Sequence, residues 1–168
     1  MFRHSLCAAL CTVALTLSPA IASAQATKAA PKAAAKAAPK AGAVKTFNLT
    51  GSDNMKFAPA VIRVKAGDTV KVNLKTVSTM PKMAMAHNFV LLKAGVDATA
   101  VATAGATARA TNFIAAKSKA QVIAATGLAG GGETVSVEFK APAAGKYTFI
   151  CTFPGHFQGG MVGQLIVE

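Results

Sequence analysis

Residues 151–161 read CTFPGHFQGGM, a stretch that carries three side chains able to bind a soft metal ion. They are the thiolate of Cys151, the imidazole of His156 and the thioether of Met161. Pro154 and three glycines let the backbone fold back on itself, so these donors can converge on one ion. A thiolate and imidazoles in a trigonal set, with a weak axial thioether, form the ligand set of blue-copper electron-transfer sites. The stretch therefore predicts a copper site.

Such a site needs a second imidazole, and residues 81–90, PKMAMAHNFV, supply it at His87. A methionine-rich segment precedes His87, and the apolar run after it predicts a strand. We expect this segment and residues 151–161 to meet from opposite sides of the ion.

The motifs PKxxMxHN at 81–88 and CTFPGH at 151–156 resemble those of the small blue (type 1) copper proteins of the cupredoxin family, most closely azurin. The resemblance runs, with gaps, from residue 45 to residue 168. It implies one type 1 copper that alternates between Cu(I) and Cu(II), in a carrier of single electrons rather than an enzyme. The metal ligands that it implies are His87, Cys151, His156 and Met161.

The chain departs from azurin at three points. Four residues separate His156 from Met161, a spacing that is more like that of auracyanin and plastocyanin. Ala86 stands where azurin has a glycine whose carbonyl lies near copper, and azurin's disulfide has no counterpart. The axial side of the expected site is where these departures matter most.

The same resemblance implies roles for residues beside the ligands. Asn88 should tie its own segment to the Cys151 segment near Thr152. Backbone N–H groups around Asn88 and Phe153 should hydrogen-bond the sulfur of Cys151 and lower its donor strength.

In the cupredoxin family, electrons pass to partner proteins through an apolar patch around the exposed edge of the second histidine ligand, here His156. The patch expected in this chain consists of Met83, Met85, Pro154 and Phe157. Methionines suit a surface that meets several partners weakly. The expected partners are redox proteins such as cytochromes or copper- or haem-containing reductases.

Short runs of β-branched and aromatic residues, separated by Gly, Asp, Asn or Pro, begin at residue 45. The expected strands are 45–50, 61–65, 69–75, 88–93, 134–139, 146–151 and 164–167. Strands of this number and length predict an all-β, Greek-key β-sandwich. Its expected core residues are Phe47, Ile62, Val64, Val70, Val72, Leu74, Val90, Leu92, Val135, Val137, Phe139, Phe149, Leu165 and Val167.

Residues 94–130 are rich in alanine and alternate poorly, which predicts a helical flap inserted into the sandwich. Asp97 is a suitable cap for one short helix that runs through residue 104, and residues 112–124 could form another. The flap side chains expected to pack onto the sandwich are Phe113, Ile114, Val122 and Ile123.

Residues 1–24 predict a cleaved secretory signal, because a basic start at Arg3 precedes an apolar run that is too short to span a bilayer. A retained membrane anchor is the alternative. Cleavage near Ala24 would place the protein in the periplasm or outside the cell, with no transmembrane segment in the mature chain. The mature chain would keep one cysteine and two histidines, all of them in the two motifs. A lone thiol in an oxidising compartment is a liability unless a metal occupies it.

Residues 25–44 are almost entirely Ala, Lys and Pro and offer little to bury, which predicts a solvated tether before a single domain at 45–168. The tether lysines supply much of the formal net charge of +12. Similar tracts in linker histones make nucleic-acid binding an alternative, but an export signal argues against it. An acidic partner, anionic lipid or cell-wall polymer is the more plausible contact.

Two other functions compete with electron transfer. A copper nitrite reductase or oxidase would need further histidines for a catalytic copper, and both mature histidines are already used. A metal carrier or storage protein, or a zinc site without a redox role, stays open because one cysteine and two histidines also suit tetrahedral zinc. Met161 favours copper, since zinc gains little from a thioether.

Overall fold

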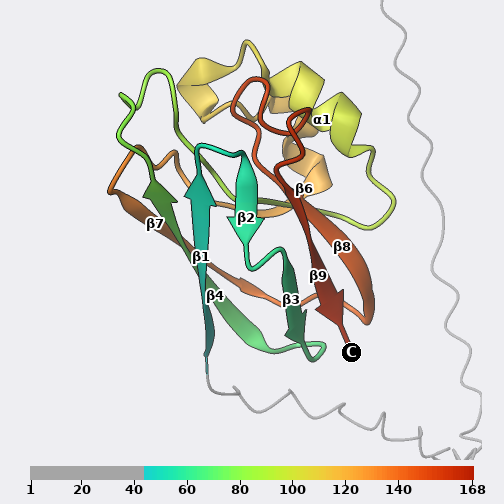
Figure 1. The fold of residues 1–168 in the computed structure, drawn as a ribbon. Helices are drawn as coiled ribbons and strands as arrows, with labels where there is room; N and C mark the ends of the chain where they lie inside the picture. The colour runs from blue at the N-terminus through green and yellow to red at the C-terminus, as the bar shows by residue number, and fades with distance from the viewer. Residues whose placement is uncertain (1–43) are drawn as a thin grey trace, which may run out of the picture. The chain divides into compact units, whose positions relative to one another are not determined.

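The computed structural model describes residues 44–168, so the predicted signal and nearly all of the predicted tether lie outside the described residues. Within this range the strands form two sheets (Figure 1). The four-stranded sheet has the order β2 (Lys56–Ala58), β1 (Lys45–Ser52), β4 (Thr69–Val77) and β7 (Thr134–Lys140). The five-stranded sheet has the order β3 (Val61–Val64), β9 (Val162–Val167), β8 (Gly145–Ile150), β5 (Val90–Leu92) and β6 (Val122–Ala125).

Strand β4 lies inside the first sheet, between β1 and β7, and turns one of its faces to the core. Val70, Val72, Leu74 and Thr76 point inward and are buried, whereas the residues between them are half-buried or exposed. β1 pairs with β4 in parallel and β7 pairs with it antiparallel. The predicted β-sandwich is confirmed by these two sheets and by their shared core.

Aromatic rings fill the space between the sheets. The ring of Phe89 lies 4.9 Å from that of Phe149 and 6.4 Å from that of Phe139, measured between centroids. Phe57 meets Phe149 edge to face at 5.2 Å. Full burial of one such side chain contributes about 1.5–3 kcal/mol to folding, so these rings fix the packing of the two sheets. Of the expected core residues, Phe47, Val135 and Val137 are only half-buried against this cluster.

β5 departs from simple alternation because both of its faces are covered. Leu91 belongs with Phe89 to the core between the sheets, whereas Val90 and Leu92 pack in a second cluster with Val101 of the flap. The strand expected over 88–93 is therefore shorter but more deeply buried than its pattern indicates. Neither β2 nor β6 was predicted, because β2 has only three residues, too few to show a period of its own, and β6 overlaps the stretch expected to be helical.

The flap begins as the sequence predicts and then differs. Helix α1 (Ala98–Gly105) has Asp97 as its N-cap, with Oδ1 accepting hydrogen bonds from the backbone N–H groups of Thr99 and Ala100. The second helix predicted over 112–124 is wrong. The 3-10 helix η2 (Ala116–Gln121) and strand β6 stand in its place, and a further 3-10 helix, η1 (Arg109–Thr111), comes just before them.

The backbone explains this difference. Asn112 and Phe113 both have positive φ values, 53° and 60°, a conformation that no α-helix accepts. The β-branched residues Val122 and Ile123 then lie in strand β6, which pairs with the edge of β5 through Val122, Ala124 and Ala125 instead of continuing a helix. Phe113 is buried as expected. Figure 1 shows the flap at the same end of the sandwich as the loop that leads into β9. None of the helices within residues 44–168 has the length and apolar character needed to cross a membrane.

Candidate metal centre

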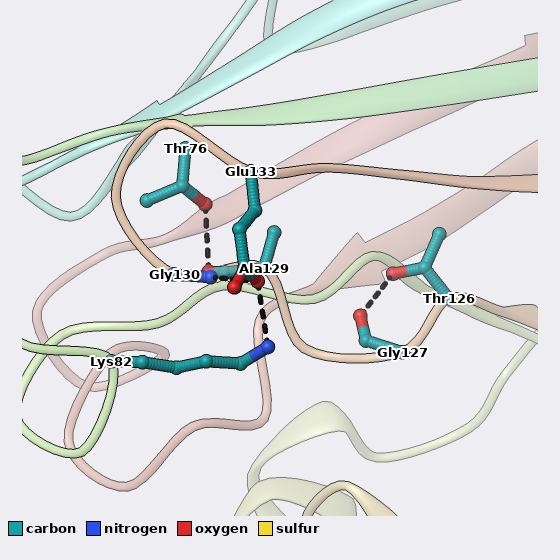
Figure 2. Close-up of polar contacts among 7 residues, drawn as sticks. All are labelled: Thr76, Lys82, Thr126, Gly127, Ala129, Gly130 and Glu133. Carbon is teal, nitrogen blue, oxygen red and sulfur yellow. Dashed lines mark hydrogen bonds and ion pairs between the residues drawn. The ribbon is translucent and has the colours of Figure 1, made fainter.

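His87 is held by backbone pairing just before β5. Its N–H donates to the carbonyl of Ala129 at 2.9 Å, and the Ala129 N–H donates back to the His87 carbonyl at 2.8 Å. The buried hydroxyl of Thr76, near the end of β4, donates to the same Ala129 carbonyl at 2.9 Å (Figure 2). The first sheet and the 126–133 segment therefore fix the backbone position of His87 from one side.

An ion pair anchors the turn that carries Ala129. Figure 2 shows the Glu133 carboxylate accepting from Lys82 Nζ at 2.6 Å and from the Gly130 N–H at 2.9 Å. These two donors hold the pKa of Glu133 below its ordinary value. A Cβ at Gly130 would lie 2.7 Å from Cβ of Lys82, so this close approach needs glycine. The loop before His87 and the turn after β6 are thus joined to each other.

The C-terminal loop folds onto itself between Cys151 and Met161. The Met161 N–H donates to the carbonyl of His156 at 2.9 Å, and the Cys151 N–H donates to the carbonyl of Met161 at 3.2 Å. Gly155 and Gly160 have φ values of 84° and 88°, which allow the two reversals of direction. The backbone folding predicted from the proline and glycines of this stretch is present.

Three predicted donors converge at this end of the sandwich. Cys151 Sγ lies 3.5 Å from His156 Nδ1 and 4.0 Å from His87 Nδ1, and the two nitrogens lie 3.1 Å apart. All three residues are buried. Ligands bound to one ion at about 2.0–2.3 Å lie roughly 3–4 Å from one another, so the separations suit a shared ion. The soft thiolate beside two imidazoles fits one type 1 copper site.

Met161 is fully buried beside these donors. A Cβ on Gly51 of β1 would lie 2.8 Å from the terminal methyl carbon of Met161 and 2.8 Å from Cδ2 of His87. The thioether end of Met161 and the His87 ring therefore both reach the space that Gly51 leaves open. Nothing in the sequence around Gly51 indicated this contact, because it joins segments that are far apart along the chain.

Asn88 joins the two ligand segments. Its Oδ1 accepts from the Thr152 N–H at 2.8 Å, and its Nδ2 donates to Thr152 Oγ1 at 2.9 Å and to the carbonyl of Asn112 at 2.8 Å. Phe153 stacks at a tilt on His156, with 4.7 Å between ring centroids, and Phe113 of the flap meets Phe153 at 5.2 Å. The flap thus contributes to the site, a contribution that the sequence did not indicate. Ala86 is fully buried next to the ligand segment.

Burial sets the protonation of the metal-free donors. It lowers the pKa of His156 to about 4, with a further lowering by His87. It also lowers the pKa of His87, against the opposing charge of Asp53. Burial raises the pKa of Cys151 to about 11, although the backbone N–H groups of Asn88 and Phe153 lower it. Both imidazoles therefore offer free lone pairs at neutral pH, whereas metal binding must displace the thiol proton.

The residues expected in the docking patch differ in exposure. Met83 is 68% exposed, and its sulfur contacts Arg109 Nη2 of the flap at 2.9 Å. Pro154 is exposed, whereas Met85 and Phe157 are half-buried. Phe157 packs against the cluster under the flap, so it supports the fold as well as the surface.

Comparisons with known proteins agree with this geometry. A family described as "Copper binding proteins, plastocyanin/azurin family" matches residues 44–168. Auracyanin-A of Chloroflexus aurantiacus is 41% identical over 118 residues, which cover 69% of this chain and 69% of that protein. Azurin iso-2 of Methylomonas sp. strain J is 41% identical over 124 residues, which cover 71% of this chain and 95% of that protein.

A solved structure of auracyanin A, whose title describes it as a "blue" copper protein, superposes with a TM-score of 0.67 at 38% identity and covers 74% of this chain and 99% of that one. The azurin iso-2 structure gives a TM-score of 0.65, also at 38% identity, and covers 74% of this chain and 98% of that one. The family match spans the described domain, and the convergent Cys and His donors lie within it. The chain belongs to the plastocyanin/azurin family of copper-binding proteins.

Proposed function

We propose that the protein carries single electrons, using one copper ion held by His87, Cys151 and His156, with Met161 as a weaker axial donor. The observation that carries this proposal is the buried convergence of one sulfur and two imidazole nitrogens within 4.8 Å of one another. Copper, when bound, supplies the Cu(I)/Cu(II) couple.

The chain's own contribution is to hold the donors in one arrangement. Cu(I) and Cu(II) prefer different geometries, so a scaffold that resists change keeps the rearrangement accompanying electron transfer small. The Asn88 hydrogen bonds, the pairing of His87 with Ala129 and the closed loop at Met161 all act without the metal. N–H groups of Asn88 and Phe153 directed at the Cys151 sulfur favour a thiolate there.

An electron carrier also fits better than an enzyme. Residues 44–168 contain only two histidines, both already in the donor cluster, so they offer none for a second, catalytic copper. The cluster is buried, and His156 is only 4% exposed, which leaves little access for a substrate.

Partner proteins would dock where the site comes closest to solvent. Pro154 lies two residues before His156, and the exposed Met83 lies in the loop before His87. Redox partners such as cytochromes or copper- or haem-containing reductases would bind this face weakly and leave quickly. Methionine suits such a surface because its side chain adapts to different partners.

Residues 1–24 have the features of a secretory signal, so we place the mature protein in the periplasm or outside the cell after cleavage near Ala24. The lysines of 25–44 would contact an acidic surface through charge alone.

Electron self-exchange of the copper-loaded protein tests the docking face. Met83→Lys should leave the visible spectrum and reduction potential close to wild type but slow self-exchange about tenfold or more at low salt, because like charges meet when two faces approach. Ala143→Lys adds the same charge at an exposed position outside the site and serves as control. Equal rates for the two variants, measured by NMR line broadening, would show that electrons leave elsewhere.

A further inference from the structure

Lys56, the first residue of β2, reaches from the first sheet to the C-terminal ligand loop. Its Nζ donates to the carbonyl of Gly159 at 3.0 Å and to the carbonyl of Gly160 at 3.2 Å. A Cβ on Gly160 would overlap the Lys56 ammonium group, which shows how closely that group approaches the Gly160 backbone. These contacts lie one and two residues before Met161.

Met55, the residue before Lys56, packs against the same Gly159–Gly160 segment. Met55 has a positive φ of 55°, and its sulfur would lie only 2.6 Å from a Cβ on Gly159. Met55 also packs against the core between the sheets. The turn from β1 to β2 therefore covers both glycines, with Met55 as an apolar contact and Lys56 as a charged donor.

Within the described domain, and apart from the Lys56 contacts, the covered segment bonds only to its own neighbours along the chain, including the Val162 N–H, which donates to the Gly160 carbonyl at 3.0 Å. Gly159 and Gly160 lack side chains that could pack, and their N–H groups bond only within the loop, to the carbonyls of Gly155 and Phe157. Adjacent glycines also carry the largest backbone entropy to be lost on ordering. A donor that binds both carbonyls limits the backbone conformations that Gly159 and Gly160 can adopt, and therefore the positions that Met161 can take.

We propose that Lys56 is a positioning residue for the axial donor, because its ammonium group fixes the Gly159–Gly160 backbone and thereby the place of Met161. An effect of Lys56 on the copper site rests on the electron-transfer function proposed above, whereas its hydrogen bonds to the loop are present without metal. Charge-assisted hydrogen bonds of this kind are among the stronger ones available at a surface.

The first test uses the metal-free protein. Lys56→Met keeps much of the apolar stem but removes the donor, and Lys56→Arg restores one. Amide hydrogen exchange at Gly160 and Met161 should become about fivefold faster in Lys56→Met, return toward wild type in Lys56→Arg, and stay unchanged in the β8 core. Lys146→Met removes the same charge from an exposed β8 lysine and is the control. Unchanged exchange in Lys56→Met, or equal acceleration in Lys146→Met, would overturn the proposal.

The second test uses the copper-loaded protein at low and high salt. Loss of an exposed cation shifts the reduction potential through a Coulomb effect that salt screens, whereas a displaced axial donor shifts it at every ionic strength. We expect the shift in Lys56→Met to persist at high salt and to be small in Lys56→Arg. A shift in reduction potential that disappears at high salt would show that Lys56 acts only through its charge at a distance, and it would refute the positioning role. If neither the wild-type protein nor any variant shows a Cu(I)/Cu(II) couple, the proposed function is refuted instead. The amide hydrogen exchange of the metal-free protein would still decide whether Lys56 holds the Gly159–Gly160 backbone.

Discussion

Replacing Asn88 with alanine should destabilise the metal-free domain far more than an ordinary loss of hydrogen bonds. Asn88 is fully buried and makes three hydrogen bonds, two with Thr152 and one with the carbonyl of Asn112. Its removal leaves the Thr152 N–H buried without that partner, since Thr152 is only 1% exposed. An unsatisfied buried donor costs about 1–3 kcal/mol, and each further lost bond about 1 kcal/mol.

The expected decrease in the free energy of unfolding is therefore about 3–5 kcal/mol. Urea denaturation of the metal-free protein, followed by circular dichroism, measures it. An unchanged slope of the free energy of unfolding against urea concentration would show that the substitution does not alter the surface area exposed on unfolding.

Asn73→Ala is the matched control. Asn73 also forms two side-chain hydrogen bonds, with Asn48 at 2.8 Å and Ser136 at 2.7 Å, but on the solvent-facing side of the sheet. Water can replace those partners, so the decrease should stay within about 1 kcal/mol. Similar effects for the two variants would refute the reasoning that burial makes Asn88 special.

Three further outcomes follow from the geometry of the site. Folding of the metal-free chain lowers the pKa of His156 from 6.5 to about 4. Between pH 4 and pH 6.5 the unfolded chain therefore binds a proton at His156 that the folded chain does not. Stability should be full above pH 6.5 and decline by up to about 3 kcal/mol as the pH falls to 4, and His156→Gln should flatten this dependence in thermal or urea unfolding. Gly51→Ala should lower the free energy of unfolding by about 1–3 kcal/mol, because its Cβ would crowd His87 and Met161, and a neutral effect would contradict the contact. Met161→Gln should keep copper bound but lower the reduction potential in voltammetry, since an oxygen donor favours Cu(II), whereas an unmoved potential would exclude Met161 as the axial donor.

The sequence predicted the sandwich and the donor cluster because both depend on local patterns. Period-two alternation marks strands such as β4, and the spacing of Cys151, His156 and Met161 is confined to one loop. The sequence of β5 shows no such alternation. A buried residue gives no sign of which layer covers it, and Phe89 and Val90 turn out to face different clusters.

Other features depended on contacts between distant segments. The positive φ values at Asn112 and Phe113 prevent the second predicted helix from starting, and the composition of an alanine-rich stretch does not reveal such a break. The space that Gly51 leaves for His87 involves residues from separate parts of the chain. These features follow from packing, which a single sequence does not specify.

A copper titration of the metal-free protein, followed by visible absorption, tests the central claim that His87, Cys151 and His156 hold one copper ion. The wild-type protein should develop an intense thiolate-to-copper band that saturates at one equivalent, and Cys151→Ser should remain folded by circular dichroism but show no such band. Absence of the band in the wild-type protein, or an unchanged band in Cys151→Ser, would contradict the claim.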